Sequence, residues 1–130
     1  MKKKFSRNWI GSKQPRKQRK YRYNAPLHIK QKFMSVNLSK YLREEYKIRN
    51  ILLKKGYTVK ILRGGFKGKT GKVERVNLKR EKVYIEGVYN VKKDGTKAPY
   101  PIHPSNLSIT EMKLDERKRN KLTSRLNIKS

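Results

Sequence analysis

The run from Leu62 to Val73 is the part of the sequence whose residue types and spacing most suggest chemistry. It reads LRGGFKGKTGKV, and its Gly68-Lys69-Thr70 resembles the end of a nucleotide-binding P-loop. A P-loop has a further glycine separated from this ending by four residues, but Arg63 occupies that position. A P-loop also leads into a helix, whereas the GKVERV that follows has the β-branched residues of a strand. No nucleoside triphosphate site is therefore predicted.

The same run has the residue types that contact a phosphodiester backbone. Four glycines in eight residues allow a tight turn and a close approach to another molecule. The basic side chains supply positive charge, and Phe66 at the tip is expected to be exposed and to stack on a base or ribose. The alternative is a solvated hairpin whose lysines only keep it soluble. The predicted contact residues are Arg63, Gly64, Gly65, Phe66, Lys67, Gly68, Lys69, Gly71 and Lys72.

The first part of the chain is a second basic segment. The first acidic residue is Glu44, and fourteen Lys or Arg residues precede it. Residues 1–24 have no sustained hydrophobic period, which is typical of an extended arm that orders only on its partner. The alternative is a solubilising tail or a transport signal. The residues predicted to neutralise phosphates or to stack on bases are Arg16, Lys17, Arg19, Lys20, Tyr21, Arg22 and Tyr23.

The remaining reactive side chains do not form a recognisable catalytic or metal site. His28 and His103 lie far apart in the sequence and lack Cys or carboxylate residues at ligand spacing, so no metal is expected. The nine acidic residues stand mostly beside basic ones, and no Ser-His-acid arrangement can be argued. His103 is expected to be structural or to face RNA. We therefore expect neither enzymatic activity nor a cofactor.

The composition agrees with a nucleic-acid partner. The 130 residues include 37 Lys or Arg and 9 Asp or Glu, which gives a formal net charge of +28. A chain of this charge repels itself, so a polyanion is expected to bind it, with nucleic acid the first candidate and an anionic membrane surface the second. No apolar run approaches the ~18 residues of a membrane span, and no apolar segment of a signal peptide follows the basic N-terminus. The absence of cysteine fits a reducing cytosol.

Two short helices are predicted after the arm. NAPLHIKQKFMS is compatible with a helix because Pro26 suits a first helical turn. LSKYLREEYKIR is predicted as a second helix, with Ser39 as its cap and Leu38, Leu42 and Tyr46 on one apolar stripe. The apolar side chains of both predicted helices, Ile29 and Phe33 in the first, are expected to be packing surfaces and not binding sites.

From Lys55 onward the hydrophobic period becomes that of strands. Asp94-Gly95 predicts a two-residue hairpin turn within this region. Short strands at this spacing favour a small SH3-like barrel. The residues predicted to point inward are Tyr57, Val59 and Ile61, then Val73 and Val76 with a bulge between them, Val83 and Ile85, and Leu107 and Ile109.

The sequence thus predicts a mainly β protein: a small SH3-like barrel with a basic N-terminal extension containing short helices and a short C-terminal helix. A basic RNA-binding arm is assigned to residues 1–24, a helical extension to 25–54, the barrel to 55–110 and a helical tail to 111–130. The tail helix is expected to begin near Asp115, where acidic residues suit the helix dipole, and to dock through Leu122 and Leu126.

Three segments together resemble a known family. Gly56 to Gly87 is similar to a KOW motif, whose central glycine would be Gly71. SKQPRKQRKYRYNAPLHIKQKFMSVNLSKYLREEY (residues 12–46) resembles the N-terminal extension of the archaeal and eukaryotic form of one family of large-subunit ribosomal proteins, and IHPSNLSITEMKLDERKR (residues 102–119) resembles its C-terminal segment. The family is that of universal ribosomal protein L twenty-four, called L twenty-six in eukaryotes. Its members often have Gly-Asp where this chain has Gly56-Tyr57, a difference that bears on turn geometry more than on RNA binding.

The resemblance implies an SH3-like barrel with a KOW motif seated on large-subunit ribosomal RNA, near the 5′ region of that molecule. It also implies a non-enzymatic, early-assembling component beside the polypeptide exit tunnel, in the cytoplasmic ribosome. Neighbouring ribosomal proteins would be its other partners, without a membrane and without self-association. The contacts carried over by the resemblance are the arm from Arg16 to Tyr23, the loop from Arg63 to Lys72, and His103-Pro104-Ser105.

Two other functions compete with this interpretation. A KOW-type transcription elongation accessory would bind polymerase and nascent RNA, but such factors usually carry a further α/β domain, for which 130 residues leave no room. A membrane-surface protein held by its basic arm would need an amphipathic helix with a large apolar face. Neither alternative accounts for both flanking segments.

Overall fold

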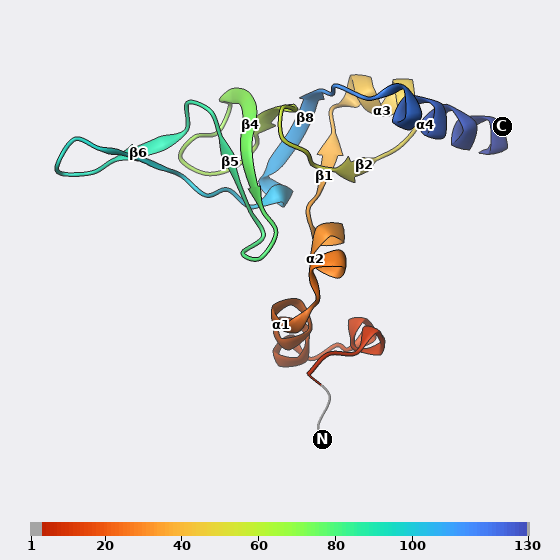
Figure 1. Ribbon diagram of the computed structural model, residues 1–130, viewed down its shortest axis with the longest axis horizontal. Coiled ribbons are helices and arrows are strands. Elements are labelled where there is room, and N and C mark those ends of the chain that lie inside the picture. The colour runs from red at the N-terminus through yellow and green to blue at the C-terminus, as the bar shows by residue number, and fades with distance from the viewer. Residues whose placement is uncertain (1–3, 130) are drawn as a thin grey trace.

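A six-stranded sheet forms the centre of the structure (Figure 1). The computed structural model describes residues 4–129. The strands pair in the order β2-β1-β8-β3-β4-β5, with β1 and β8 parallel and the other neighbours antiparallel. The strands are β1 (Ser35–Leu38), β2 (Asn50–Leu52), β3 (Thr58–Ile61), β4 (Thr70–Asn77), β5 (Lys82–Ile85) and β8 (Leu107–Glu111). The domain is mixed: within residues 4–129 this sheet is accompanied by four α-helices, which is consistent with the predicted mainly β domain.

The sheet buries the side chains that the alternating pattern placed inward. Those predicted inward on β3, β5 and β8 are buried, and so is Val73, while Val76 is partly buried at the edge of the core. The register of β4 against β5 shifts between Val73 and Arg75, which confirms the predicted bulge. Burial of these apolar side chains, at roughly 25 cal/mol per Å², is the main source of stability for the sheet.

Two strands of the sheet lie in the segment that was assigned as a helical extension. β1 and β2 lie within residues 25–54, and Leu38, predicted on a helical stripe, is a buried residue of β1. The assignment of Leu38 to a helix was wrong because SVNL is too short to display a strand period. Its partner β8 also lies far away in the sequence, paired through Asn37 with Ser108.

Two short helices lie in the extension. Helix α2 (Leu27–Phe33) begins after Pro26, and helix α3 (Lys40–Tyr46) begins after Ser39. Ser39 occupies the N-cap position, although its side chain makes no capping hydrogen bond. Lys47 ends α3 in a left-handed conformation, with φ of 51°.

The basic arm is helical, and the expectation of an extended arm was wrong. A 3₁₀ turn, η1 (Arg7–Gly11), leads into helix α1 (Pro15–Asn24). Pro15 suits the first position of a helix, and Arg, Lys and Gln are good helix formers even without an apolar stripe. The side-chain amide of Gln18 donates to the carbonyl oxygens of Ile10 (2.9 Å) and Ser12 (2.6 Å), which ties η1 to α1. The arm extends from one side of the sheet (Figure 1).

A two-stranded ribbon projects from the sheet (Figure 1). It consists of β6 (Tyr89–Val91) and β7 (Lys97–Pro99), which confirms the predicted hairpin. Its turn is wider than the two residues expected, because the amide of Lys92 donates to the carbonyl oxygen of Thr96. Asp94 Oδ1 accepts hydrogen bonds from the amide and the hydroxyl of Thr96 at 3.0 and 2.6 Å.

The chain closes with a short 3₁₀ turn, η2 (Pro104–Asn106), then β8 and helix α4 (Glu116–Lys129), which confirms the expected C-terminal helix. Leu122 is buried as predicted. The side chain of Leu126 lies outside the described residues. Within residues 4–129, no helix has the length and apolar character needed to cross a membrane.

Candidate nucleic-acid interface

The glycine-rich loop joins two antiparallel strands, β3 and β4. Gly64 and Gly68 have φ of 99° and 89°, values that favour glycine. The amide of Gly68 donates to the carbonyl oxygen of Ile61 at 2.8 Å, and the amide of Leu62 donates to that of Asn106 at 2.7 Å. Strand β4 begins at Thr70, so no helix follows and the phosphate cradle of a P-loop is not built. The exposed basic side chains of this region are Arg63, Lys67, Lys69 and Lys72.

Gly71 lies in β4 and has a packing role. A Cβ atom at this position would stand 2.8 Å from the carbonyl oxygen of Glu86 and 2.8 Å from Cγ2 of Ile85. Both distances are shorter than real Cβ contacts allow, so a side chain here would force β4 and β5 apart. Gly71 was predicted to contact RNA, and the structure places it against the neighbouring strand.

The ring of Phe66 is not exposed at the loop tip as expected. It is half-buried and packs on Tyr100 with ring centroids 5.0 Å apart and planes tilted by 56°. The ammonium group of Lys69 lies 5.0 Å from the centroid of the Phe66 ring. The expectation of an exposed ring was wrong because its partner is 34 residues away in the sequence and gives no local signal. The ring therefore helps to hold the loop in shape.

The loop and the His103 turn meet around one cavity. This cavity of about 190 Å³ is lined from both sides, by the loop and by residues near η2. The lining includes Arg63, Gly64, Gly65, Phe66, Lys82 and His103. The fold thus brings together two segments that were predicted separately, and it adds Lys82 of β5, which the sequence pattern did not single out.

His103 has a structural role in this turn. The amide of Ser105 donates to its Nδ1 at 3.2 Å, and the Ser105 hydroxyl lies 2.8 Å from the same atom. Burial lowers the pKa of His103, and the positive charges of Lys82 and Arg22 lower it further, while Glu81 opposes them. A neutral ring that accepts at Nδ1 carries its proton on Nε2. His103 is thereby suited to donate a neutral hydrogen bond from Nε2.

Helix α1 separates the predicted arm residues between two faces. By the helical period, Arg16, Arg19, Lys20 and Tyr23 share one face, hereafter the basic face of α1. All four are exposed, and Tyr23 retains 82% of its surface. The Lys20 ammonium lies 5.2 Å from the Trp9 ring centroid. Lys17 is also exposed but lies to one side of this face.

Tyr21 and Arg22, on the other side of α1, are already engaged. Tyr21 is buried and stacks on Phe5 at 5.1 Å, with Phe33 edge-on at 5.9 Å. This ring belongs to the small cluster that holds α1 to α2, so the predicted stacking of Tyr21 on a base, which stays a prediction, would require the ring to leave that cluster. Arg22 Nη2 lies 2.6 Å from Oε2 of Glu81, so its charge is matched within the protein.

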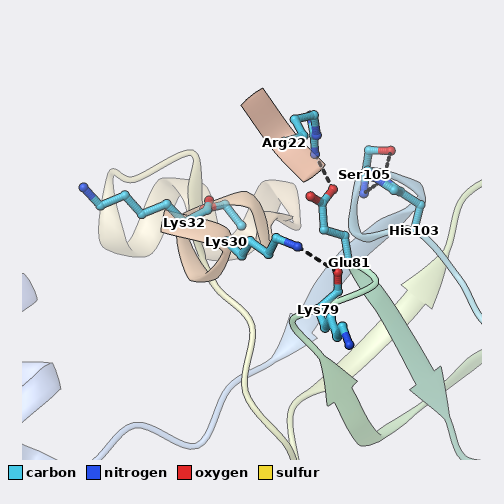
Figure 2. A network of polar contacts seen from close by, with 8 residues as sticks. Arg22, Lys30, Lys32, Lys79, Glu81, His103 and Ser105 are labelled. Carbon is cyan, nitrogen blue, oxygen red and sulfur yellow. Dashed lines mark hydrogen bonds and ion pairs between the residues drawn. The ribbon is translucent and has the colours of Figure 1, made fainter. Parts of the chain in front are cut away.

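The turn between β4 and β5 is where the arm meets the sheet. Besides the ion pair of Arg22 with Glu81, the ammonium of Lys30 donates to the carbonyl oxygen of Lys79 at 3.2 Å. Figure 2 shows Glu81 reaching Arg22 with His103 close by. These contacts bring α1 near the His103 turn, although nothing in the sequence pattern joined the two.

The described residues 4–129 contain no group of three His, Cys, Asp or Glu residues able to hold a metal ion. The chemistry that the arrangement supports is electrostatic. Exposed Arg and Lys side chains, backbone amides of a glycine loop and a neutral imidazole are donors suited to phosphate and ribose oxygens.

Comparison with known proteins identifies relatives over most of the chain. A sequence model of the family of ribosomal proteins described as L26 in eukaryotes and as L24 in archaea matches residues 12–125. "Large ribosomal subunit protein uL24" of Methanothrix thermoacetophila is 54% identical over 114 residues, which are 88% of this chain and 98% of that protein. The protein of the same name from Methanosarcina barkeri is 51% identical over 108 residues, which are 83% of this chain and 93% of that protein.

Proposed function

The chain belongs to the family of eukaryotic L26 and archaeal L24 ribosomal proteins, and we propose on this basis that it is a structural constituent of the large ribosomal subunit. It binds large-subunit ribosomal RNA in the cytoplasmic ribosome and is not an enzyme. The observation that carries the RNA contact is that two basic segments, α1 and the glycine loop, both lie near the His103 turn: the loop shares a cavity with this turn and with Lys82, and α1 is joined to the neighbouring β4–β5 turn through Arg22 and Glu81. The alternative of a transcription elongation accessory is not supported by the relatives.

The site works as a set of phosphate contacts at fixed spacing. The basic face of α1 lies along one stretch of RNA backbone, and the loop bearing Arg63 and Lys67 contacts another. Each neutralised phosphate releases condensed counterions, so affinity falls steeply as salt rises. The rigid sheet sets the distance between the two contacts and thereby favours one RNA shape over others.

Membership of this family also supports more detailed proposals about the fold, the RNA site and the neighbouring proteins. Residues 55–110 are proposed to form an SH3-like barrel of KOW type, an idea that the bridge between Val83 and Ile102 supports by joining the end of the domain to β5. The RNA site is proposed to lie near the 5′ region of the large-subunit RNA, beside the exit tunnel, with assembly early and as a single copy. Neighbouring ribosomal proteins complete its surroundings.

Phe66 is proposed to contact RNA through the part of its ring that Tyr100 leaves open. Changing Phe66 to Leu keeps an apolar side chain on Tyr100 but removes the aromatic face. We expect the affinity for ribosomal RNA to fall about fivefold or more, since stacking on a base contributes roughly 1–3 kcal/mol. Titration of both proteins with the same RNA measures this, with Lys113→Ala as the control for an exposed side chain elsewhere. If the wild-type and Phe66→Leu proteins bound RNA equally well and were equally stable, the ring would have only a packing role.

A direct test of the proposed function is competition among RNAs. Purified protein is titrated with a 5′ fragment of large-subunit ribosomal RNA and, separately, with equally long fragments from the rest of that RNA and from an unrelated messenger RNA. We expect the 5′ fragment to bind at least tenfold more tightly in moderate salt, a difference of about 1.4 kcal/mol. Equal affinity for all fragments would reduce the protein to a nonspecific polycation and contradict the proposal.

A further inference from the structure

Glu81 occupies an unfavourable place in the turn that joins β4 to β5. Its backbone φ is 56°, in the left-handed region where Gly and Asn are favoured. A glutamate there raises the free energy of the folded chain, unless its side chain makes a contact that offsets the strain. The contact it makes is with the N-terminal arm.

The carboxylate of Glu81 pairs with a residue distant in the sequence. Its Oε2 lies 2.6 Å from Nη2 of Arg22 on α1, a pair separated by 59 positions. The Glu81 side chain is 15% exposed and that of Arg22 is 46% exposed, so the pair is partly shielded from water. The Arg22 guanidinium also lies 4.8 Å from the ring centroid of Phe33, which helps to hold it in place.

A second contact joins the same turn to helix α2, which follows the arm (Figure 2). The Lys30 ammonium, on α2, donates to the carbonyl oxygen of Lys79 at 3.2 Å, and Lys30 is 9% exposed. Helices α1 and α2 are thus each joined to the β4–β5 turn by one polar contact. The Lys79 acceptor belongs to the backbone, so the Glu81 carboxylate is the partner on the turn that a substitution can remove.

We propose that Glu81 is a positioning residue for RNA binding: it pairs with Arg22 and holds helix α1, which carries the basic face, near the His103 turn before RNA arrives. The inference rests on the proposed function. An arm that is already placed loses less conformational entropy when it binds, so its phosphate contacts yield more affinity. Arg22, predicted from the sequence to neutralise a phosphate, instead fixes the direction of the helix that carries the other basic side chains.

The proposal and simple electrostatics predict opposite changes in RNA affinity for the substitution Glu81→Gln. Removing an acid from a chain of charge +28 strengthens attraction to RNA. Loss of a positioning contact weakens binding instead, by about two- to fivefold for a partly exposed ion pair. Glu74→Gln is the matched control, because it removes the same charge from an exposed position on β4. It is expected to bind as tightly as the wild-type chain or slightly more tightly.

Swapping the two charges of the Arg22–Glu81 pair distinguishes the effect of holding α1 in position from the effect of net charge. The double variant Arg22→Glu, Glu81→Arg has the wild-type net charge and the opposite orientation of the pair. The exchanged pair and a matched control, Arg22→Glu with Glu74→Arg, are each compared with the Arg22→Glu single variant. Both double variants add the same charge to that single variant. We expect the exchanged pair to restore more of the affinity for RNA than the control does. The melting temperature of every variant shows whether a loss of affinity comes from loss of folding and not from loss of the contact.

Docking is measured without RNA by distances between spin labels. The chain has no cysteine, so Lys17→Cys on α1 and Lys60→Cys on β3, both exposed, accept one label each. We expect a narrow distance distribution in the labelled chain that retains Glu81 and a broader one in the labelled Glu81→Gln variant. An unchanged distribution, or a Glu81→Gln chain that binds RNA as well as the Glu74→Gln control, would overturn the proposal. If the distribution broadens as expected but the wild-type chain has no preference for large-subunit RNA, docking stands and the proposed function fails.

Discussion

A triple variant of the basic face, Arg16→Gln, Arg19→Gln, Lys20→Gln, is expected to bind large-subunit ribosomal RNA on the order of a hundredfold more weakly at about 0.1 M salt. The three side chains are exposed on one face of α1, and each is expected to neutralise one phosphate. Glutamine retains the helix propensity, so the helix itself is preserved. The slope of log affinity against log salt should become less steep by about 2–3, measured by titrations at several salt concentrations.

The control for this variant removes the same charge from scattered positions. Lys40, Lys92 and Lys113 are exposed on three different parts of the chain, and their triple glutamine variant should retain a slope closer to that of the wild type. Equal losses for both triple variants would mean that RNA responds to the total charge alone. The basic face of α1 would then have no special place in the interface.

Gly71→Ala is expected to destabilise the folded protein by about 1–3 kcal/mol, the usual cost of overpacking. The added methyl group would stand 2.8 Å from the carbonyl oxygen of Glu86, a backbone atom that cannot move without disturbing the pairing of β4 with β5. Since each kcal/mol corresponds to roughly 4–8 °C in a small domain, the melting temperature should fall by several degrees. Chemical denaturation of both proteins measures the free energy of unfolding directly.

Gly65→Ala is the matched control for this prediction. No atom lies within 4 Å of the position that its Cβ would take, and its φ lies outside the left-handed region. Its effect on the free energy of unfolding should stay within about 0.5 kcal/mol. A Gly71→Ala chain as stable as the Gly65→Ala chain would show that the strands adjust freely, and that the glycine is required by something other than packing.

The strands could be predicted from the sequence where alternation extends over several residues. Tyr57, Val59 and Ile61 are an example, and all three are buried. Helix α1 was not predicted, because RKQRKYRY has no apolar stripe and the helix depends on Tyr21 packing against Phe5 and Phe33. A pattern-based prediction detects periodic burial, and this helix buries only one large side chain.

The candidate site was predictable in its parts but not in its arrangement. The exposed basic residues of the loop and of α1 are identifiable from residue type and spacing. The pairing of Arg22 with Glu81 and the packing of Phe66 on Tyr100 join residues that are distant in the sequence. Such contacts depend on how the sheet twists and pairs, which local patterns do not encode.

The most direct test of the RNA contact is to crosslink the protein to RNA in cells, purify it at moderate salt and sequence the attached RNA. We expect reads concentrated on one site of large-subunit ribosomal RNA, with crosslinked peptides from α1 and from the loop between β3 and β4. Reads spread over nascent messenger RNAs, with polymerase subunits in the same purification, would contradict it.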